Sequence, residues 1–243
     1  MLCLAANPKE IETEKLEIMS NKIENRYIEY MNCSDYGIFE ITDGILVARN
    51  ASNDFGQLGL NRLDDLDVIY EKIQIAEHVI HFDYNLETLI YLTEDGKLYG
   101  LGNNNYGQLS RDIDKYHVGY GHALKATCIT RPTLIMEDVK YAVLGRSHLL
   151  ILKNDYSLWG LGRNENNELG IVREEEVRYY YKPQKIMSNI RYIAASGQNS
   201  AAINKKQQLY VWGNNRHSQI ARDGKTSNAS MPQLVMRSVN AKD

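Results

Sequence analysis

A segment rich in glycine and asparagine recurs four times along the 243 residues of the chain. The four copies read LVARNASNDFGQLG (46–59), LYGLGNNNYGQL (98–109), LWGLGRNENNELG (158–170) and LYVWGNNRHSQI (209–220). Their closing aliphatic residues, Leu58, Leu109, Leu169 and Ile220, are separated by 51, 60 and 51 residues. A repeat at this interval indicates an array of similar structural units, such as a solenoid or a propeller.

Each copy contains residues that favour a tight turn. An asparagine precedes the closing aliphatic residue in all four copies, and glycine or glutamine occupies matching positions around it: Asn53, Gly56, Gln57, Gly102, Asn104, Gly107, Gln108, Gly162, Asn164, Gly213 and Asn215. Glycine and asparagine adopt positive φ angles at low cost, which suits the stretch Gly102–Asn105. The side-chain amides of Asn104 and Gln108 can satisfy backbone groups of the turn, while Leu109 returns to the core. We interpret these repeat residues as structural.

Apolar segments with strand character precede each turn. The first set is RYIEYM (26–31), HVIHFD (78–83), VKYAVL (139–144) and IRYIAA (190–195), and the second is IFEITDG (38–44), LIYLTEDG (89–96), LLILKNDY (149–156) and AAINKKQQ (201–208). Alternation of apolar and polar residues in LIYLTEDGKLYGLG predicts a hairpin with Asp95-Gly96 at its tip. An all-β unit of this size cannot bury both faces alone, so radial stacking into a β-propeller is expected.

The repeat resembles that of the regulator of chromosome condensation family. The best copy is LIYLTEDGKLYGLGNNNYGQL (89–109), and the Gly-x-x-His-Ser-Leu element of the family occurs once in altered form at Gly145–Leu150. The resemblance covers residues 26 to 236 and implies a β-propeller that binds proteins. It also implies, as an alternative, guanine-nucleotide exchange on a small Ras-like GTPase. The usual propeller of the family has seven blades, whereas four are visible in this sequence.

The repeats predict a single propeller domain over residues 1–243. We expect repeats at about 26–77, 78–138, 139–189 and 190–235, with partial repeats at 1–25 and 236–243. Two interpretations of the ends stay open. Strands from both termini share a composite blade, or the chain is part of a longer propeller with exposed blade edges. The second interpretation predicts self-association through those open edges.

Motifs that suggest catalysis or ligand binding have simpler structural explanations. Gly100–Gly102 and Gly160–Gly162 have no helix behind them, whereas a phosphate-binding glycine loop requires a helix N-terminus. Ser147 and His148 are neighbours in a strand and point in opposite directions, so we interpret His148 as a structural hydrogen-bonding group. The run Glu174–Glu176 is typical of a solvated connector.

One candidate set of metal ligands, His117, His122 and Cys128, falls in or near the longest connector, but loop spacing alone is a weak indication of a metal site. We therefore expect no metal, no cofactor and no enzyme activity.

Two connectors are better candidates for function, because propeller loops vary while the blades stay rigid. The candidate partner-binding residues are Arg111, Tyr116, Tyr120 and His122 in the first connector, and Arg178, Tyr179, Tyr180 and Tyr181 in the second. Tyrosine combined with arginine is enriched at protein-binding hot spots. In the alternative interpretation, some of these tyrosines cap the sheet and the charges only solubilise the loop. We expect a non-catalytic protein-interaction module that binds another protein.

Composition narrows the classes of protein further. The chain has 28 Lys and Arg against 31 Asp and Glu, for a net charge of −3, which argues against a general nucleic-acid binder. A hydrophobic content of 43% excludes wholesale disorder. No apolar run is long enough to cross a bilayer, the N-terminus does not resemble a signal peptide, and the three cysteines are scattered. These features predict a cytoplasmic protein with no membrane partner.

Overall fold

The computed structural model describes residues 28–34, 37–85, 87–110, 127–172, 177–220 and 228–239 of the chain. Within these ranges the regular structure is almost entirely β-strand. None of the described residues belongs to a helix long and apolar enough to span a lipid bilayer. Most of the strands form four antiparallel sheets of four strands each, while β4 (Ala51–Asn53) and β5 (Asp64–Ile69) make a separate small ladder.

Each four-stranded sheet is one blade, and its strands follow one another along the chain. The first blade contains β1 (Ile28–Ser34), β2 (Gly37–Thr42), β3 (Ile45–Arg49) and β6 (Ile73–Ala76). The second contains β7 (Val79–Tyr84), β8 (Thr88–Thr93), β9 (Leu98–Gly102) and β10 (Ile129–Met136). The third contains β11 (Val139–Leu144), β12 (His148–Lys153), β13 (Leu158–Arg163) and β14 (Tyr179–Met187). The fourth contains β15 (Ile190–Ser196), β16 (Asn199–Asn204), β17 (Leu209–Gly213) and β18 (Ala229–Met236).

The second strand of a blade is buried on both sides of its sheet. In β8 and β12 the first five residues are all buried, because a neighbouring blade covers each face. These strands therefore appear in the sequence as nearly continuous apolar runs. The alternation of apolar and polar residues noted for 89–102 does not correspond to alternating burial in β8. The predicted hairpin is present: β8 pairs with β9 around a turn in which Gly96 has a φ of 77°.

Apolar layers hold consecutive blades together. The first layer joins Phe39, Ile41 and Leu46 to Phe82, Leu89, Tyr91 and Leu101. The second joins Ile90, Leu92 and Leu98 to Ala142, Leu149 and Ile151, and the third joins Val143, Leu150 and Leu152 to Ile193, Ala202 and Trp212. Adjacent residues of one strand thus serve opposite blades, with Leu149 facing the second blade and Leu150 facing the fourth. Each fully buried aliphatic side chain contributes about 1.5–3 kcal/mol to stability.

Polar groups on β7 link the second blade to the third. His81 Nε2 lies 2.9 Å from the carbonyl oxygen of Ala142, and Asp83 Oδ2 accepts a 2.8 Å hydrogen bond from the backbone N–H of Leu144. Burial disfavours the charged form of each side chain. It therefore lowers the pKa of His81 to about 4 and raises the pKa of Asp83 to about 6.

His148 links the third blade to the fourth. The Ser200 hydroxyl donates to the carbonyl oxygen of Glu168 at 2.7 Å, so it accepts the hydrogen bond from His148 Nε2, 2.9 Å away. The imidazole ring packs on Gly145, where an added Cβ would come within 2.0 Å of the ring. Burial lowers the pKa of His148 to about 4. His148 is therefore an inter-blade hydrogen-bonding residue, and the structural interpretation of the Ser147-His148 pair is confirmed.

The first blade carries an ion pair on the side of its sheet that faces away from the second blade. Glu40 lies between Phe39 and Ile41, which pack on the second blade, so its side chain is on the opposite side. Arg49 donates to Glu40 through Nε at 3.0 Å. The strand registers place Tyr91, Ile151 and Ala202 at the position of Glu40, and Leu101, Leu161 and Trp212 at that of Arg49. A charged pair thus replaces the apolar groups that form the blade junctions.

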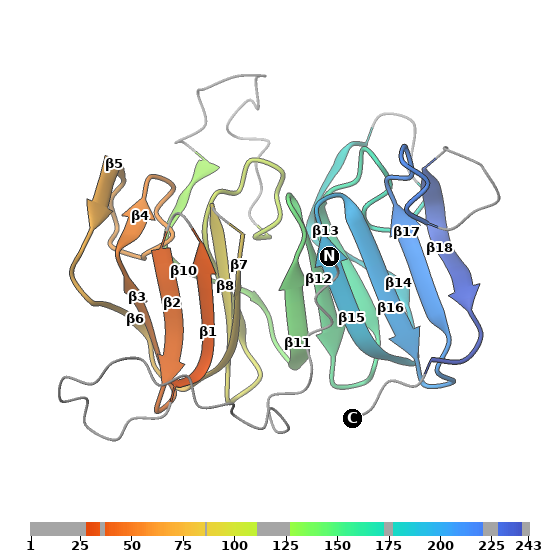
Figure 1. Cartoon of the computed structure of the whole chain (residues 1–243), viewed down its shortest axis with the longest axis horizontal. Coiled ribbons are helices and arrows are strands. Elements are labelled where there is room, and N and C mark those ends of the chain that lie inside the picture. Colours follow the sequence, from red (N-terminus) through yellow and green to blue (C-terminus); the bar gives the residue numbers. More distant parts are fainter. Residues whose placement is uncertain are drawn as a thin grey trace.

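The four blades form an open arc, with the first and fourth blades at opposite ends (Figure 1). Among the described residues, no strand of the first blade pairs with a strand of the fourth. The prediction of an all-β, partial β-propeller with four visible blades is therefore confirmed. The interpretation of a composite blade depends on residues 1–25, which lie outside the described residues.

Candidate functional site

The arc has two faces with different loops. We call the face that carries the repeat turns 53–59, 104–110, 164–170 and 215–220 the connector face, and it lies at the top of Figure 1. The opposite face carries the hairpins at 43–44, 94–97, 154–157 and 205–208, and we call it the hairpin face. Both long connectors singled out from the sequence leave their blades at the connector face.

The four repeat turns share one hydrogen-bonded frame. In every turn the asparagine is fully buried, and its Oδ1 accepts the backbone N–H of the residue five positions later. The distances are 3.0 Å for Asn53, 2.8 Å for Asn104, 2.9 Å for Asn164 and 2.9 Å for Asn215. The asparagine carbonyl oxygen also accepts the N–H three positions later, at 3.0–3.2 Å. These contacts direct Leu58, Leu109, Leu169 and Ile220 into the core.

A second side chain closes each turn. A side-chain oxygen of Gln57, Gln108, Glu168 or Gln219 accepts the backbone N–H two positions earlier, at 3.0, 3.0, 2.8 and 2.9 Å respectively. Glu168 uses its other carboxylate oxygen to accept the side-chain amide of Asn166 at 3.0 Å. The first three of these side chains are buried, whereas Gln219 in the fourth turn is exposed.

Each of the first three turns also packs against the next blade. Gly107 has a φ of 74°, and a Cβ at this position would lie 2.9 Å from the Cβ of Tyr181. Gly56 approaches Thr130 in the same way, and Gly170 approaches Trp212. The positive φ and this close approach together explain why glycine occurs in these turns. The prediction of positive φ over Gly102–Asn105 is right only for Gly102, since Asn103, Asn104 and Asn105 have negative values.

The two positions directly after the asparagine differ from turn to turn. These positions hold Asp54 and Phe55 in the first turn, Asn105 and Tyr106 in the second, Glu165 and Asn166 in the third, and Arg216 and His217 in the fourth. Among them, Arg216 and His217 are exposed, while Tyr106 is half-buried. A constant frame therefore carries four chemically different pairs on the connector face, with Asn166 buried in the third.

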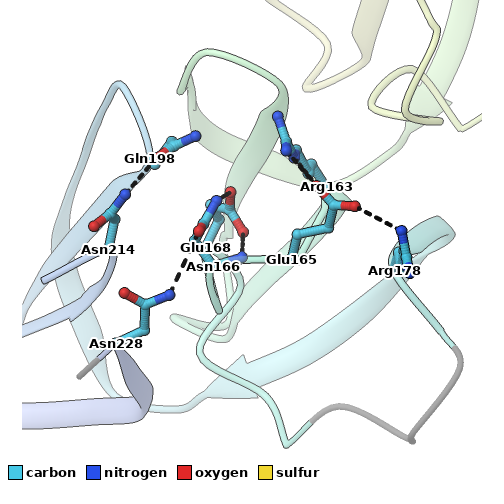
Figure 2. Close-up of polar contacts among 8 residues, drawn as sticks. All are labelled: Arg163, Glu165, Asn166, Glu168, Arg178, Gln198, Asn214 and Asn228. Carbon is cyan, nitrogen blue, oxygen red and sulfur yellow. Dashed lines mark hydrogen bonds and ion pairs between the residues drawn. The ribbon is translucent and has the colours of Figure 1, made fainter. Parts of the chain in front are cut away.

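Charged side chains distinguish the third turn (Figure 2). In the other turns, the residue before the asparagine accepts the N–H two positions later: Ser52 at 3.3 Å, Asn103 at 2.8 Å and Asn214 at 2.9 Å. Arg163 occupies this position in the third turn, and its guanidinium group carries no atom that could accept the backbone N–H. Its Nε instead donates to the Glu165 carboxylate at 2.8 Å, and Arg178 approaches the same carboxylate at 3.5 Å. Arg178 is the most accessible of the three, with 54% of its side chain exposed.

Amide groups extend this polar cluster to the fourth blade. Asn228 donates to Asn166 Oδ1 at 3.4 Å, and Asn166 in turn donates to Glu168. Asn214 of the fourth blade donates to Gln198 in the hairpin before β16 (Figure 2). The connector face between the third and fourth blades is thus lined by groups whose positions are fixed by hydrogen bonds.

The predicted partner-binding residues have different positions. Arg178 is exposed beside Glu165, but Tyr179, Tyr180 and Tyr181 are half-buried in β14 and do not form a loop. The ring of Tyr179 lies 5.4 Å from that of Tyr106, and Tyr181 backs Gly107. The β-propensity of tyrosine and its packing on the second blade explain this strand. Arg111, Tyr116, Tyr120 and His122 lie outside the described residues.

Sequence reasoning missed the cluster of Arg163, Glu165 and Asn166. A signal for it exists at Arg163, because the other repeats have Ser52, Asn103 and Asn214 at the matching position. Of the predicted metal set, His117 and His122 lie outside the described residues, and Cys128 is buried. Within the described ranges no three His, Cys, Asp or Glu side chains are grouped to hold a metal ion.

Comparison with known proteins identifies relatives of the repeat. No protein-family model matches the chain. The human X-linked retinitis pigmentosa GTPase regulator is 31% identical over 159 residues, which cover 64% of this chain and 15% of the relative. The guanine nucleotide exchange factor SRM1 of Saccharomyces cerevisiae is 28% identical over 141 residues, which cover 50% of this chain and 27% of the relative.

Solved structures of the yeast protein Prp20 share the fold. Prp20, described as yeast RCC1 and bound to Kap60 in one structure, superposes with a TM-score of 0.73 at 20% identity, covering 88% of this chain and 50% of Prp20. A second structure, from a study of binding to Gsp1p and histones, gives a TM-score of 0.72. This chain therefore spans about half of Prp20 and smaller shares of the other relatives. Repeat sequence and blade structure together show that the chain belongs to the regulator of chromosome condensation repeat family of β-propeller proteins.

Proposed function

We propose that the chain is a non-catalytic protein-interaction module that binds a partner protein through its connector face. The observation that carries the proposal is the third turn, where Glu165 is held between Arg163 and Arg178 outside the shared turn frame. Arg163 stands where the other turns have a side chain that accepts a backbone N–H, and it donates to Glu165 instead. The pair therefore does not help to form the turn, and we assign it a role in recognition at the surface. Loops on a rigid scaffold are the usual place for recognition.

Aromatic side chains next to this turn support the proposal. The guanidinium of Arg163 lies 5.2 Å from the centre of the Tyr106 ring, and the centre of the Tyr179 ring lies 5.4 Å from the same point. Tyrosine and arginine held by neighbours lose little conformational entropy on binding, which is why they dominate hot spots. Arg178 and Tyr106 therefore form the centre of the proposed surface.

A small Ras-like GTPase is the partner class that the comparisons favour. One relative is named a GTPase regulator and another a guanine nucleotide exchange factor. Acting on such a partner requires no bond chemistry in the propeller, because a regulator changes the affinity of the GTPase for its nucleotide. Guanine-nucleotide exchange is accordingly the second candidate function.

Binding to a panel of small Ras-like GTPases, with Gsp1p included, tests the proposal. The purified chain is titrated against each GTPase in the GDP-bound and nucleotide-free states. We expect Arg178→Glu to weaken binding about tenfold, because it places a carboxylate beside Glu165. Arg237→Glu is the matched control, since Arg237 is exposed near the end of β18 on the hairpin side.

The outcomes separate the two functions. Faster release of labelled GDP from a bound GTPase supports exchange, whereas binding without faster release supports an interaction module alone. Absence of binding across the panel would count against a GTPase partner. Equal affinities of the Arg178→Glu and Arg237→Glu variants would show that the third turn is not the binding surface.

A further inference from the structure

The hairpin face of the third and fourth blades carries a cluster of lysines around one tyrosine. Lys140 Nζ lies 4.8 Å from the centre of the Tyr156 ring, and Lys205 Nζ lies 3.4 Å from it. Lys206 follows Lys205 in the same hairpin, and all three lysines are exposed. The backbone N–H of Ile190 donates to the carbonyl oxygen of Tyr156 at 3.0 Å, which holds this tyrosine at the junction of the two blades.

These lysines do not form ion pairs with the carboxylates around them. None of the ion pairs formed within the described ranges involves Lys140, Lys205 or Lys206. Three exposed carboxylates lie close in sequence: Glu137 three residues before Lys140, and Asp138 and Asp155, which have other partners. Asp138 pairs with Lys153 at 3.4 Å, and Asp155 accepts hydrogen bonds from the backbone and hydroxyl of Ser157. Two ammonium groups held on one ring repel each other, and the ring relieves only part of that repulsion.

The other half of the hairpin face has the opposite charge. Exposed carboxylates of the first two blades lie at the hairpins or at the links between blades: Asp43, Glu77, Glu94, Asp95 and Glu137. Carboxylates therefore predominate on this face over the first two blades, although Lys97 pairs with Asp95 there, and lysines predominate over the other two, although Asp138 and Asp155 are exposed. A long polyanion such as a nucleic acid would meet the acidic half, whereas a short acidic segment can occupy the basic half alone.

We infer that the surface formed by Lys140, Tyr156, Lys205 and Lys206 binds an acidic segment of a partner protein. The lysines supply ammonium groups to carboxylates, and Tyr156 holds two of those groups in place. This surface is on the face opposite the proposed GTPase-binding turns, so the chain can join two partners at once. The inference does not depend on the function proposed for the connector face.

Fluorescence anisotropy with a labelled oligoglutamate peptide tests this inference on the full chain. We expect the wild-type chain to bind the peptide and to lose affinity as salt is raised, because the contacts are exposed and electrostatic. The double variants Lys140→Glu/Lys205→Glu and Lys205→Glu/Lys206→Glu should each weaken binding at least tenfold. Lys72→Glu is the matched control, because Lys72 is exposed at the connector end of β6.

Three results would overturn the inference. The first is an absence of peptide binding by the wild-type chain at low salt. The second is equal binding by the wild-type chain and by both double variants. The third is tighter binding of a labelled oligonucleotide of matched length, which would make the surface a nucleic-acid site. Circular dichroism of every variant establishes that the blades are folded before affinities are compared.

Discussion

At the scale of single residues, buried ionisable side chains serve as hydrogen-bonding groups between blades. His81 and Asp83 connect the second blade to the third, and His148 connects the third to the fourth. Burial disfavours the charged form of each side chain, so it lowers the pKa of both histidines and raises the pKa of Asp83. The protonation of these groups is therefore coupled to the stability of the blade junctions.

We predict that acid destabilises the chain between pH 6.5 and pH 4. Both histidines have a pKa of about 4 in the folded state, below the ordinary 6.5, so the unfolded chain binds these two protons first and stability falls as pH falls. Asp83, with its pKa raised to about 6, acts in the opposite direction with one proton. The net decrease in the free energy of unfolding between pH 6.5 and pH 4 is about 3 kcal/mol.

Urea denaturation at a series of pH values measures this effect. The variant His148→Gln retains a donor for Ser200 and removes one titrating group, so its free energy of unfolding should depend less steeply on pH. A free energy that is constant between pH 6.5 and 4, or a slope unaffected by His148→Gln, would show that these histidines do not control acid stability.

At the scale of elements, the repeat turn is the unit that builds the propeller. It satisfies its own backbone through Asn164 and Glu168 or their equivalents, and in the first three blades it packs on the blade that follows. One short segment thus folds locally and also sets the distance between blades. The two residues after the asparagine vary between turns, and exposed ones such as Arg216 and His217 can carry recognition.

Replacing Gly107 in the second turn separates the backbone conformation of the turn from its packing on the next blade. Gly107→Ala forces alanine to adopt a φ of 74° and brings its Cβ to 2.9 Å from Tyr181, so we expect a loss of about 3 kcal/mol. Gly197→Ala is the matched control, because Gly197 has a φ of 56° but no atom near the added Cβ. It should cost about 1 kcal/mol.

Thermal or urea denaturation of both variants gives the comparison. Equal losses would mean that backbone strain alone explains the glycine and that the contact with Tyr181 contributes nothing.

Comparison of the elements shows which features of the structure could be predicted from the sequence. The turns, the hairpin at Asp95-Gly96 and the all-β arc follow from residue patterns that recur, because repeated spacing reports local geometry directly. The cluster around Glu165 does not recur, and its partners Arg163 and Arg178 are brought together only by the pairing of β13 with β14. Likewise, Lys140 and Lys205 meet at Tyr156 only because two blades pack side by side.

At the scale of the whole molecule, the outer side of the first blade differs chemically from the junctions between blades. The first blade presents the Glu40–Arg49 ion pair where the other blades present apolar side chains to a preceding blade. Charged outer faces keep the end units of repeat arrays soluble. We propose that this pair limits self-association through open blade edges, which only the interpretation of the chain as part of a longer propeller predicts.

The double variant Glu40→Leu/Arg49→Leu tests the effect of this pair on association. The change creates an apolar outer face, so light scattering should detect a mass that rises with concentration, beyond that of the wild-type chain. The matched control is Asp95→Leu/Lys97→Leu, which removes an exposed ion pair of 2.6 Å at a hairpin. If both double variants have the same mass as the wild-type chain, the ion pair does not limit association.

Amide hydrogen exchange tests whether the connector face binds the partner. The exchange of the free chain is compared with that of the chain saturated by a GTPase that binds it. We predict slower exchange in the turns 104–110 and 164–170 and at Arg178, with no change in the hairpins 154–157 and 205–208. Protection confined to those hairpins, with unchanged exchange in the turns, would contradict it.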